Sequence, residues 1–130
     1  MTENERIGLE NRQRDAITNY IDILGRTVRI KIDRPIGSVH PKHPNVIYPI
    51  NYGFVENLMG GDGEEQDVYL LGVNEKVMEY KAKVIAVVHR LNDNEDKWVA
   101  CPANMDFSRE EIFKNIYFQE QFYKSEIFMK

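Results

Sequence analysis

Cysteine is nearly absent from this chain, since Cys101 is the single one in 130 residues. A disulfide within the chain is therefore excluded, and no cysteine set for zinc is available. Cys101 lies in the apolar run WVAC, which predicts a buried structural thiol. The sequence leaves open the alternative that Cys101 is a nucleophile served by His89 as its base.

Long hydrophobic runs and an excess of basic residues are also lacking. No apolar stretch is long enough to span a membrane, and the polar start MTENERIGLENRQRD has no signal region, so we expect a cytoplasmic protein. With 17 Lys and Arg against 21 Asp and Glu, the formal net charge is −4, which argues against a nucleic-acid surface. A small anionic substrate remains compatible with this charge, because a site can be locally basic on an acidic protein.

Proline is scarce outside one segment, RPIGSVHPKHPNVIYP. The four prolines there exclude a helix and predict a long extended loop or an edge segment. His40 and His43 lie three apart in this loop, but without a helix their spacing does not enforce a shared face. We therefore do not interpret them as a metal site.

The residues that are present favour one domain, residues 1–130, with a sizeable core, since 42 % of them are hydrophobic. Helical spacing predicts a helix over residues 5–24 with Gly25 as its stop, within an N-terminal segment 1–25. Alternation and apolar runs predict strands at TVRIKID, INYGFV, DVYLLGV, KVIAVVH and WVACP, which together indicate a small barrel or sandwich over residues 27–102. A capping box at Ser108 and Glu111 opens C-terminal helices over residues 108–130, with SEIFMK as a separate last turn.

Three acids follow a glycine-rich turn in GGDGEEQDVYLLGV. In an extended backbone Asp62 and Glu64 face one side, and Asp67 begins the next strand. Such carboxylates repel one another unless a hard divalent cation joins them. The alternative is a solvated acidic turn, which is the commoner fate of such a run. A second polar turn, NDNEDK, resembles an ordinary hairpin tip, but in a small barrel both turns can open onto one end.

Taken in order, YPINYGFV, GDGEEQDVYLLGV and DKWVACP resemble the soluble, magnesium-dependent inorganic pyrophosphatases of the first family. The first element matches that family's Tyr-Pro-x-Asn-Tyr-Gly strand, and Asp62, Glu64 and Asp67 match its three spaced acids. Lys97 matches the lysine before the last strand, and Tyr123 with Lys124 matches a Tyr-Lys pair near the C-terminus. The resemblance covers roughly residues 28–124.

The resemblance implies a mainly β protein with α elements (α+β), namely a five-stranded, oligonucleotide-binding-type (OB-like) barrel with N-terminal and C-terminal helices packed outside. It implies hydrolysis of pyrophosphate to two phosphates by a water that Mg²⁺, or Mn²⁺ in its place, activates. Catalytic roles then fall to Asp62, Asp67 and Tyr52. The implied metal ligands are Asp62, Glu64, Asp67, Asp93 and Glu95. The implied phosphate-binding residues are Arg29, Lys42, Lys97, Tyr123 and Lys124.

Several positions depart from the family pattern. Glu64 and Glu65 replace an aspartate and a proline, and Arg29-x-Lys31 replaces a lysine-x-glutamate pair. His40 stands near the position of a phosphate-binding arginine, for which Lys42 is a substitute. The turn before Lys97 is short, so Asp93 with Glu95 or Asp96 are its only acidic counterparts.

These departures keep alternatives open. The chain is expected to take a small anionic substrate, pyrophosphate or a related molecule, and neither nucleic acid nor membrane. Hydrolysis of another phosphoanhydride or nucleotide, or non-catalytic binding of phosphate or a nucleotide on the same fold, are the alternatives. Apolar side chains near the C-terminus leave assembly into a homo-oligomer open.

Overall fold

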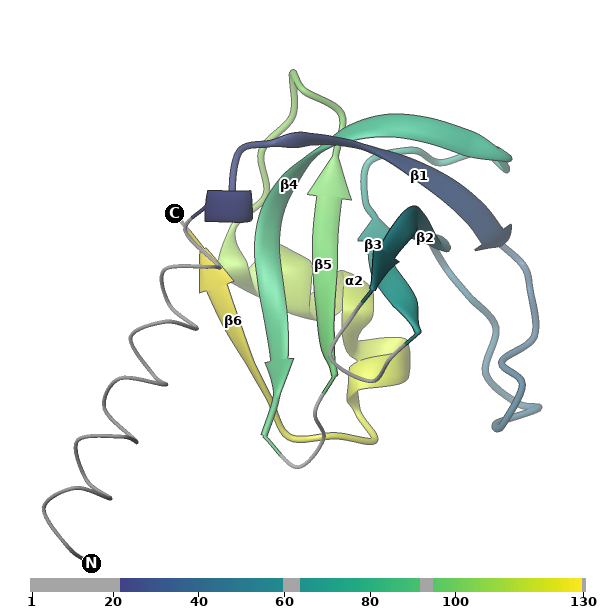
Figure 1. Ribbon diagram of the computed structural model, residues 1–130. Helices are drawn as coiled ribbons and strands as arrows, with labels where there is room; N and C mark the ends of the chain where they lie inside the picture. Colours follow the sequence, from purple (N-terminus) through teal and green to yellow (C-terminus); the bar gives the residue numbers. More distant parts are fainter. Residues whose placement is uncertain (1–21, 60–63, 92–94, 130) are drawn as a thin grey trace, which may run out of the picture.

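Strands dominate the part of the chain that the computed structural model describes, residues 22–59, 64–91 and 95–129 (Figure 1). These residues form β1 (Thr27–Arg34), β2 (Asn51–Met59), β3 (Glu65–Leu70), β4 (Glu79–Arg90), β5 (Asp96–Cys101), α2 (Arg109–Glu120) and β6 (Ser125–Met129). All five strands predicted from alternation and apolar runs are present.

The first five strands close into a barrel. Their order is β1-β2-β3-β5-β4, and β4 returns to pair with β1, from Thr27 opposite Lys83 to Lys31 opposite Glu79. The β3–β5 pair is parallel and the other pairs are antiparallel. The predicted mainly β, OB-like barrel is therefore confirmed.

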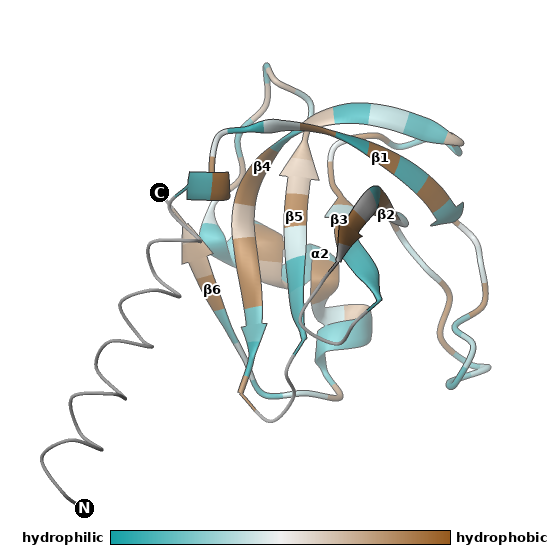
Figure 2. Ribbon diagram, in the orientation of Figure 1, coloured by the Kyte–Doolittle hydropathy of each residue, from teal (hydrophilic) through white to brown (hydrophobic). Residues whose placement is uncertain are grey.

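Alternation along the strands divides the core into two layers. Ile30, Val68, Leu70, Ala82 and Ala100 form one buried cluster contributed by β1, β3, β4 and β5. Their neighbours on the other face form a second cluster, in which Tyr69, Val88 and Val99 pack with Ile112 and Ile116 of α2. Figure 2 shows the part of β4 that lies in front of α2 as a nearly continuous apolar stretch.

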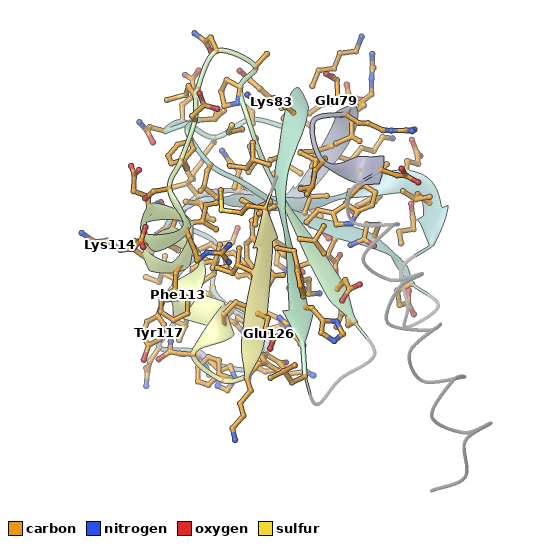
Figure 3. All side chains as sticks on the ribbon, turned by 90° about the vertical axis from the view of Figure 1, so that its left-hand side faces the viewer. Glu79, Lys83, Phe113, Lys114, Tyr117 and Glu126 are labelled. Carbon is orange, nitrogen blue, oxygen red and sulfur yellow. The ribbon has the colours of Figure 1, made fainter. Side chains whose placement is uncertain are left out.

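The helix α2 begins at the predicted capping box. The Ser108 hydroxyl accepts from the Glu111 amide at 3.1 Å, and the Glu111 carboxylate accepts from the Ser108 amide at 3.0 Å. Ile112 and Ile116 face the sheet, whereas Phe113, Lys114 and Tyr117 point away from it (Figure 3). Within the described residues no helix has both the length and the apolar content to cross a membrane.

The prediction that residues 108–130 are all helical is wrong at the end. The helix stops at Glu120, and β6 pairs antiparallel with the second half of β4, where Val87 faces Phe128 and Val88 faces Ile127. The far half of β4 has no barrel partner on the edge where β1 leaves it, and β6 supplies the hydrogen bonds there. Tyr123 and Lys124 consequently lie in the turn between α2 and β6.

Only the end of the predicted N-terminal helix lies within the described residues. Residues 22 and 23 are helical, and Gly25 adopts a φ of 90°, a left-handed conformation that suits glycine as a helix stop. The remainder of the predicted helix, residues 5–21, lies outside the described residues. The proline-rich segment after β1 is a loop, as predicted, with one isolated bridge between Val39 and Ile47.

Candidate functional site

A cavity of about 390 Å³ lies next to the C-terminal end of α2. It is on the same face of the sheet as that helix. Val68 points into the barrel, so Asp67 points to the opposite face, and on β5 the same alternation separates Lys97 from Trp98. Tyr52 reaches the cavity from β2. The full lining is Asp33, Arg34, His40, Pro41, Lys42, Tyr52, Glu64, Asp67, Arg90, Glu95, Lys97, Gln119 and Tyr123.

The Lys97 ammonium lies between two carboxylates. Its Nζ is 2.5 Å from Asp67 Oδ2 and in contact with Glu95 Oε1, and its side chain is only 5 % exposed. The aromatic ring of Tyr52 lies 5.7 Å from Nζ. Burial alone would lower the pKa of Lys97, but Tyr52, Asp67 and Glu95 outweigh burial and raise that pKa.

Burial has the dominant effect on the pKa of Glu95, whereas for Lys97 the neighbouring groups outweigh burial. Burial and the neighbouring Asp67 carboxylate raise the pKa of Glu95, against the lowering influence of Lys97 and Arg90. Two carboxylates therefore share one ammonium in a partly buried place, which is an arrangement that favours positive charge at this point.

Arg90 forms the wall behind this cluster. Its Nε is 3.1 Å from Glu120 Oε1, and its Nη2 is 2.8 Å from Glu120 Oε2, so the two groups make a bidentate pair. The Tyr123 ring covers the guanidinium with 3.6 Å between its centroid and Cζ, and Arg90 Nη1 lies 3.4 Å from Glu95. Arg90 holds Glu120, Tyr123 and Glu95 around one side of the cavity.

A chain of hydrogen bonds links the rim to this wall. Arg34 Nη1 donates to the Tyr48 hydroxyl at 2.9 Å, and that hydroxyl donates to Gln119 Oε1 at 2.9 Å. Gln119 Nε2 donates to the Tyr69 hydroxyl at 2.7 Å, which donates to Glu120 Oε2 at 2.5 Å. The last turn of α2 thus fixes the side chains that surround the site.

The cavity brings together most of the residues predicted to form the site. Those in its lining are Lys42, Tyr52, Glu64, Asp67, Glu95, Lys97 and Tyr123. Asp62 and Asp93 lie outside the described residues.

Two predicted phosphate-binding residues do not line the cavity. Arg29 pairs with Glu79 at 3.4 Å and its side chain is 60 % exposed. Lys31, two residues further along the same face of β1, pairs with Glu56 at 3.2 Å, so neither cation replaces an acid at the cavity mouth. Lys124 is exposed in the turn before β6 and is absent from the lining.

The alternative Cys101–His89 arrangement does not form. On the β4–β5 ladder Cys101 lies opposite Lys83, whereas His89 lies opposite Asp96 near the other end. His89 Nδ1 is 2.7 Å from Asp96 Oδ1, and burial raises the pKa of the Cys101 thiol. The prediction of a buried structural thiol is confirmed.

The predicted site did not include several of the lining residues, namely Asp33, Arg34, Pro41, Arg90 and Gln119. Arg34 and Asp33 both reach the cavity because the β1–β2 register shifts between Ile32 and Arg34. Arg90 closes an apolar strand, and its partner Glu120 is distant in sequence. Only the polar ending of that strand, HR after KVIAVV, signals a wall residue.

The donor chemistry of the paired carboxylates fits a hard divalent cation, since magnesium prefers carboxylate oxygens. Among the residues that the structure describes, no three His, Cys, Asp or Glu side chains are grouped to hold a metal ion. Asp67 and Glu95 nevertheless converge on a single cation, the Lys97 ammonium, which marks a place where positive charge is favoured.

Fold and cavity together define an OB-type barrel with a polar cavity in which lysine and arginine side chains lie beside paired carboxylates. The chain belongs to the inorganic pyrophosphatase family, whose sequence profile matches residues 20–126, and with it to the diphosphatase-like hydrolases. No curated protein sequence matches the chain at a significant level.

Solved structures share this fold at low sequence identity. An inorganic pyrophosphatase from Ehrlichia chaffeensis superposes with a TM-score of 0.58 at 18 % identity, covering 79 % of this chain and 85 % of the other. One from Helicobacter pylori gives a TM-score of 0.56 at 18 % identity, with coverages of 80 % and 83 %. One from Thermus thermophilus gives 0.54 at 16 % identity, with coverages of 78 % and 80 %.

Proposed function

We propose that this chain hydrolyses inorganic pyrophosphate to two phosphates with the help of a divalent metal ion. The observation that carries the proposal is the partly buried Asp67–Lys97–Glu95 cluster on the wall of a cavity that Arg34 and Lys42 also line. Family membership gives the same substrate class.

Charge in the cavity supports metal dependence. The described lining is balanced, because four carboxylates face four Lys or Arg side chains, and the charge of a polyanionic substrate therefore exceeds what the side chains alone can neutralise. These residues are Asp33, Glu64, Asp67 and Glu95 against Arg34, Lys42, Arg90 and Lys97.

Asp67 and Glu95, with Asp62, Glu64 and Asp93 as further ligands, would hold Mg²⁺ or Mn²⁺, which would supply the Lewis acidity that activates water. Asp67, fixed at the start of β3, orients the attacking water and accepts its proton. Lys97 and Lys42 bind phosphate oxygens and neutralise charge that builds on the leaving phosphate.

Two tyrosines act as hydrogen-bond donors to the substrate. Burial raises the pKa of Tyr52, and Asp67 raises it further, so its hydroxyl stays protonated at neutral pH and donates to a phosphate oxygen. Tyr123 lines the cavity with its ring held against Arg90, which fixes the direction of its hydroxyl.

The test is phosphate release from pyrophosphate with Mg²⁺ or Mn²⁺, for the wild type and for Asp67→Asn. We expect metal-dependent release in the wild type and a loss of about 100-fold or more in Asp67→Asn, because the group that orients the water is gone. Asp106→Asn is the matched control, since this carboxylate is 95 % exposed and should leave the rate unchanged.

A second candidate, non-catalytic binding of phosphate or a nucleotide, is favoured by one observation: Lys97 already balances Asp67 and Glu95. It predicts binding of phosphate compounds without release from any phosphoanhydride, with any metal. Release from a nucleoside triphosphate but not from pyrophosphate would instead support a hydrolase for another phosphoanhydride.

A further inference from the structure

The Lys97 ammonium is bound mostly within the protein. Of its three donors, two hydrogen-bond to Asp67 and Glu95, and the Tyr52 ring lies 5.7 Å from its Nζ. With 5 % of its side chain exposed, little of Lys97 is left to meet a ligand from solvent. To hold a phosphate oxygen, Lys97 must therefore give up at least one carboxylate.

Release of Lys97 by itself is unfavourable. It leaves Asp67 and Glu95 as two neighbouring carboxylates without their shared counter-charge, in a place where their side chains are 27 % and 17 % exposed. Arg90 brings no additional charge, because its Nε and Nη2 are bound to Glu120 and its Nη1 already pairs with Glu95 at 3.4 Å while Lys97 is in place. A cation from solvent is needed to complete the exchange.

We infer that Lys97 is an internal counter-ion that a divalent cation displaces from Asp67 and Glu95, which frees its ammonium for a substrate phosphate. The inference rests on the proposed function for the identity of both ligands. Metal and phosphate then bind with positive coupling, and the coupling is reciprocal because each ligand favours the same displaced position of Lys97.

Calorimetric titration with Mn²⁺ alone, and with the non-hydrolysable analogue methylenediphosphonate, tests this coupling. We expect Mn²⁺ to tighten the binding of methylenediphosphonate about 10-fold or more in the wild type. In Lys97→Met the competing ammonium is gone, so Mn²⁺ alone should bind about 10-fold or more tightly than to the wild type, and the coupling should fall toward unity. Unchanged or weaker Mn²⁺ binding in Lys97→Met would overturn the inference.

Lys83→Met is the matched control. Lys83 is also partly buried, with 26 % of its side chain exposed. It pairs with Asp106 at 3.4 Å and lies in the first half of β4, where that strand pairs with β1. The substitution removes the same charge from the chain, so Mn²⁺ affinity should stay at the wild-type value. A rise in both variants would assign the effect to overall charge and contradict the inference.

A measurement on the wild type covers the case in which Lys97→Met fails to fold. The ¹⁵N-labelled lysine spectrum should contain one slowly exchanging ammonium signal from Lys97, and Mg²⁺ should shift or remove it. A signal unchanged at saturating Mg²⁺ would overturn the displacement. Displacement without hydrolysis would reject the proposed function alone, and hydrolysis without displacement would reject this inference alone.

Discussion

Arg90 and Glu120 form the most buried ion pair beside the cavity, with side chains that are 3 % and 1 % exposed. The pair is completed by the Tyr69 hydroxyl, by the Ser125 hydroxyl at 2.8 Å from Glu120 Oε1, and by the Tyr123 ring. The carboxylate of Glu120 thus accepts from four donor groups without contact with solvent. These side chains tie together β3, β4, α2 and the start of β6.

Replacement of Arg90 by methionine should lower the free energy of unfolding by about 3–5 kcal/mol, because it leaves the buried Glu120 carboxylate without its counter-charge. Arg29→Met is the control, since Arg29 makes an exposed pair with Glu79 that contributes at most about 1 kcal/mol. Urea unfolding of both variants measures the difference. Equal losses of unfolding free energy in the two variants would show that burial of the Arg90–Glu120 pair does not determine its contribution to stability.

At the scale of elements, β1 and β2 approach each other more closely than side chains allow. A Cβ atom placed on Gly53 would lie 1.9 Å from the Lys31 carbonyl oxygen and 2.9 Å from the Ile32 Cα. The glycine in YPINYGFV is therefore required by contact between two strands. The close approach lies next to the register shift that turns Asp33 and Arg34 toward the cavity.

Gly53→Ala should consequently destabilise the chain by about 2–3 kcal/mol or more, since the added methyl group forces β1 and β2 apart. Gly37→Ala is a useful comparison, because a Cβ on Gly37 would make only an ordinary contact with Lys76 Cε at 3.8 Å. The substitution therefore costs about 1 kcal/mol, for the left-handed φ of 94°. Denaturant unfolding should rank the two variants in this order. The reverse order would mean that β1 and β2 can move apart at Gly53 at little cost in stability.

Elements were predictable from sequence where a local pattern decides them. Val28, Ile30 and Ile32 alternate with polar residues, which correctly predicts strand β1. The capping box of Ser108 and Glu111 likewise predicts the start of α2. The strand β6 was missed because SEIFM follows a helical spacing directly, and its strand state depends on pairing with β4. Pairing between distant segments leaves no signal in a short window.

The candidate site was predictable to a similar extent. Motif residues such as Tyr52, Asp67 and Lys97 do meet in the cavity. Arg29 was assigned to the site from its place in a motif, but the strand face on which it lies leads it to Glu79 instead. Arg90 could not be found, because its role depends on Glu120, which only tertiary packing brings near.

At the scale of the whole molecule, the described carboxylates at this point of the site already have cationic partners within the chain. Lys97 lies between Asp67 and Glu95, and Arg90 pairs with Glu120 and Glu95. A chain that needs its metal to fold loses structure when the metal is removed, as small zinc domains do. Here we infer that folding and metal binding are separable.

Removal of divalent metal with EDTA should accordingly abolish phosphate release while changing the melting temperature by less than about 5 °C, a shift that corresponds to about 1 kcal/mol. The far-UV circular dichroism melt measures this, and added Mg²⁺ should restore activity. Lys97→Met should show a larger loss on EDTA treatment, because its carboxylates lack the ammonium. Cooperative unfolding of the wild type in EDTA would contradict the separation.

The twelve residues of β4 pair with three other strands, with β1 along the first part and with β5 and β6 further on. Ring closure between Thr27 and Lys83 therefore has to wait until β4 has been synthesised. Because such long-range closure is entropically costly, refolding on a timescale of about milliseconds to seconds is expected, as for other small barrels. During that interval the newly made β1–β2 hairpin has no partner on one edge, which makes early folding the stage most exposed to aggregation.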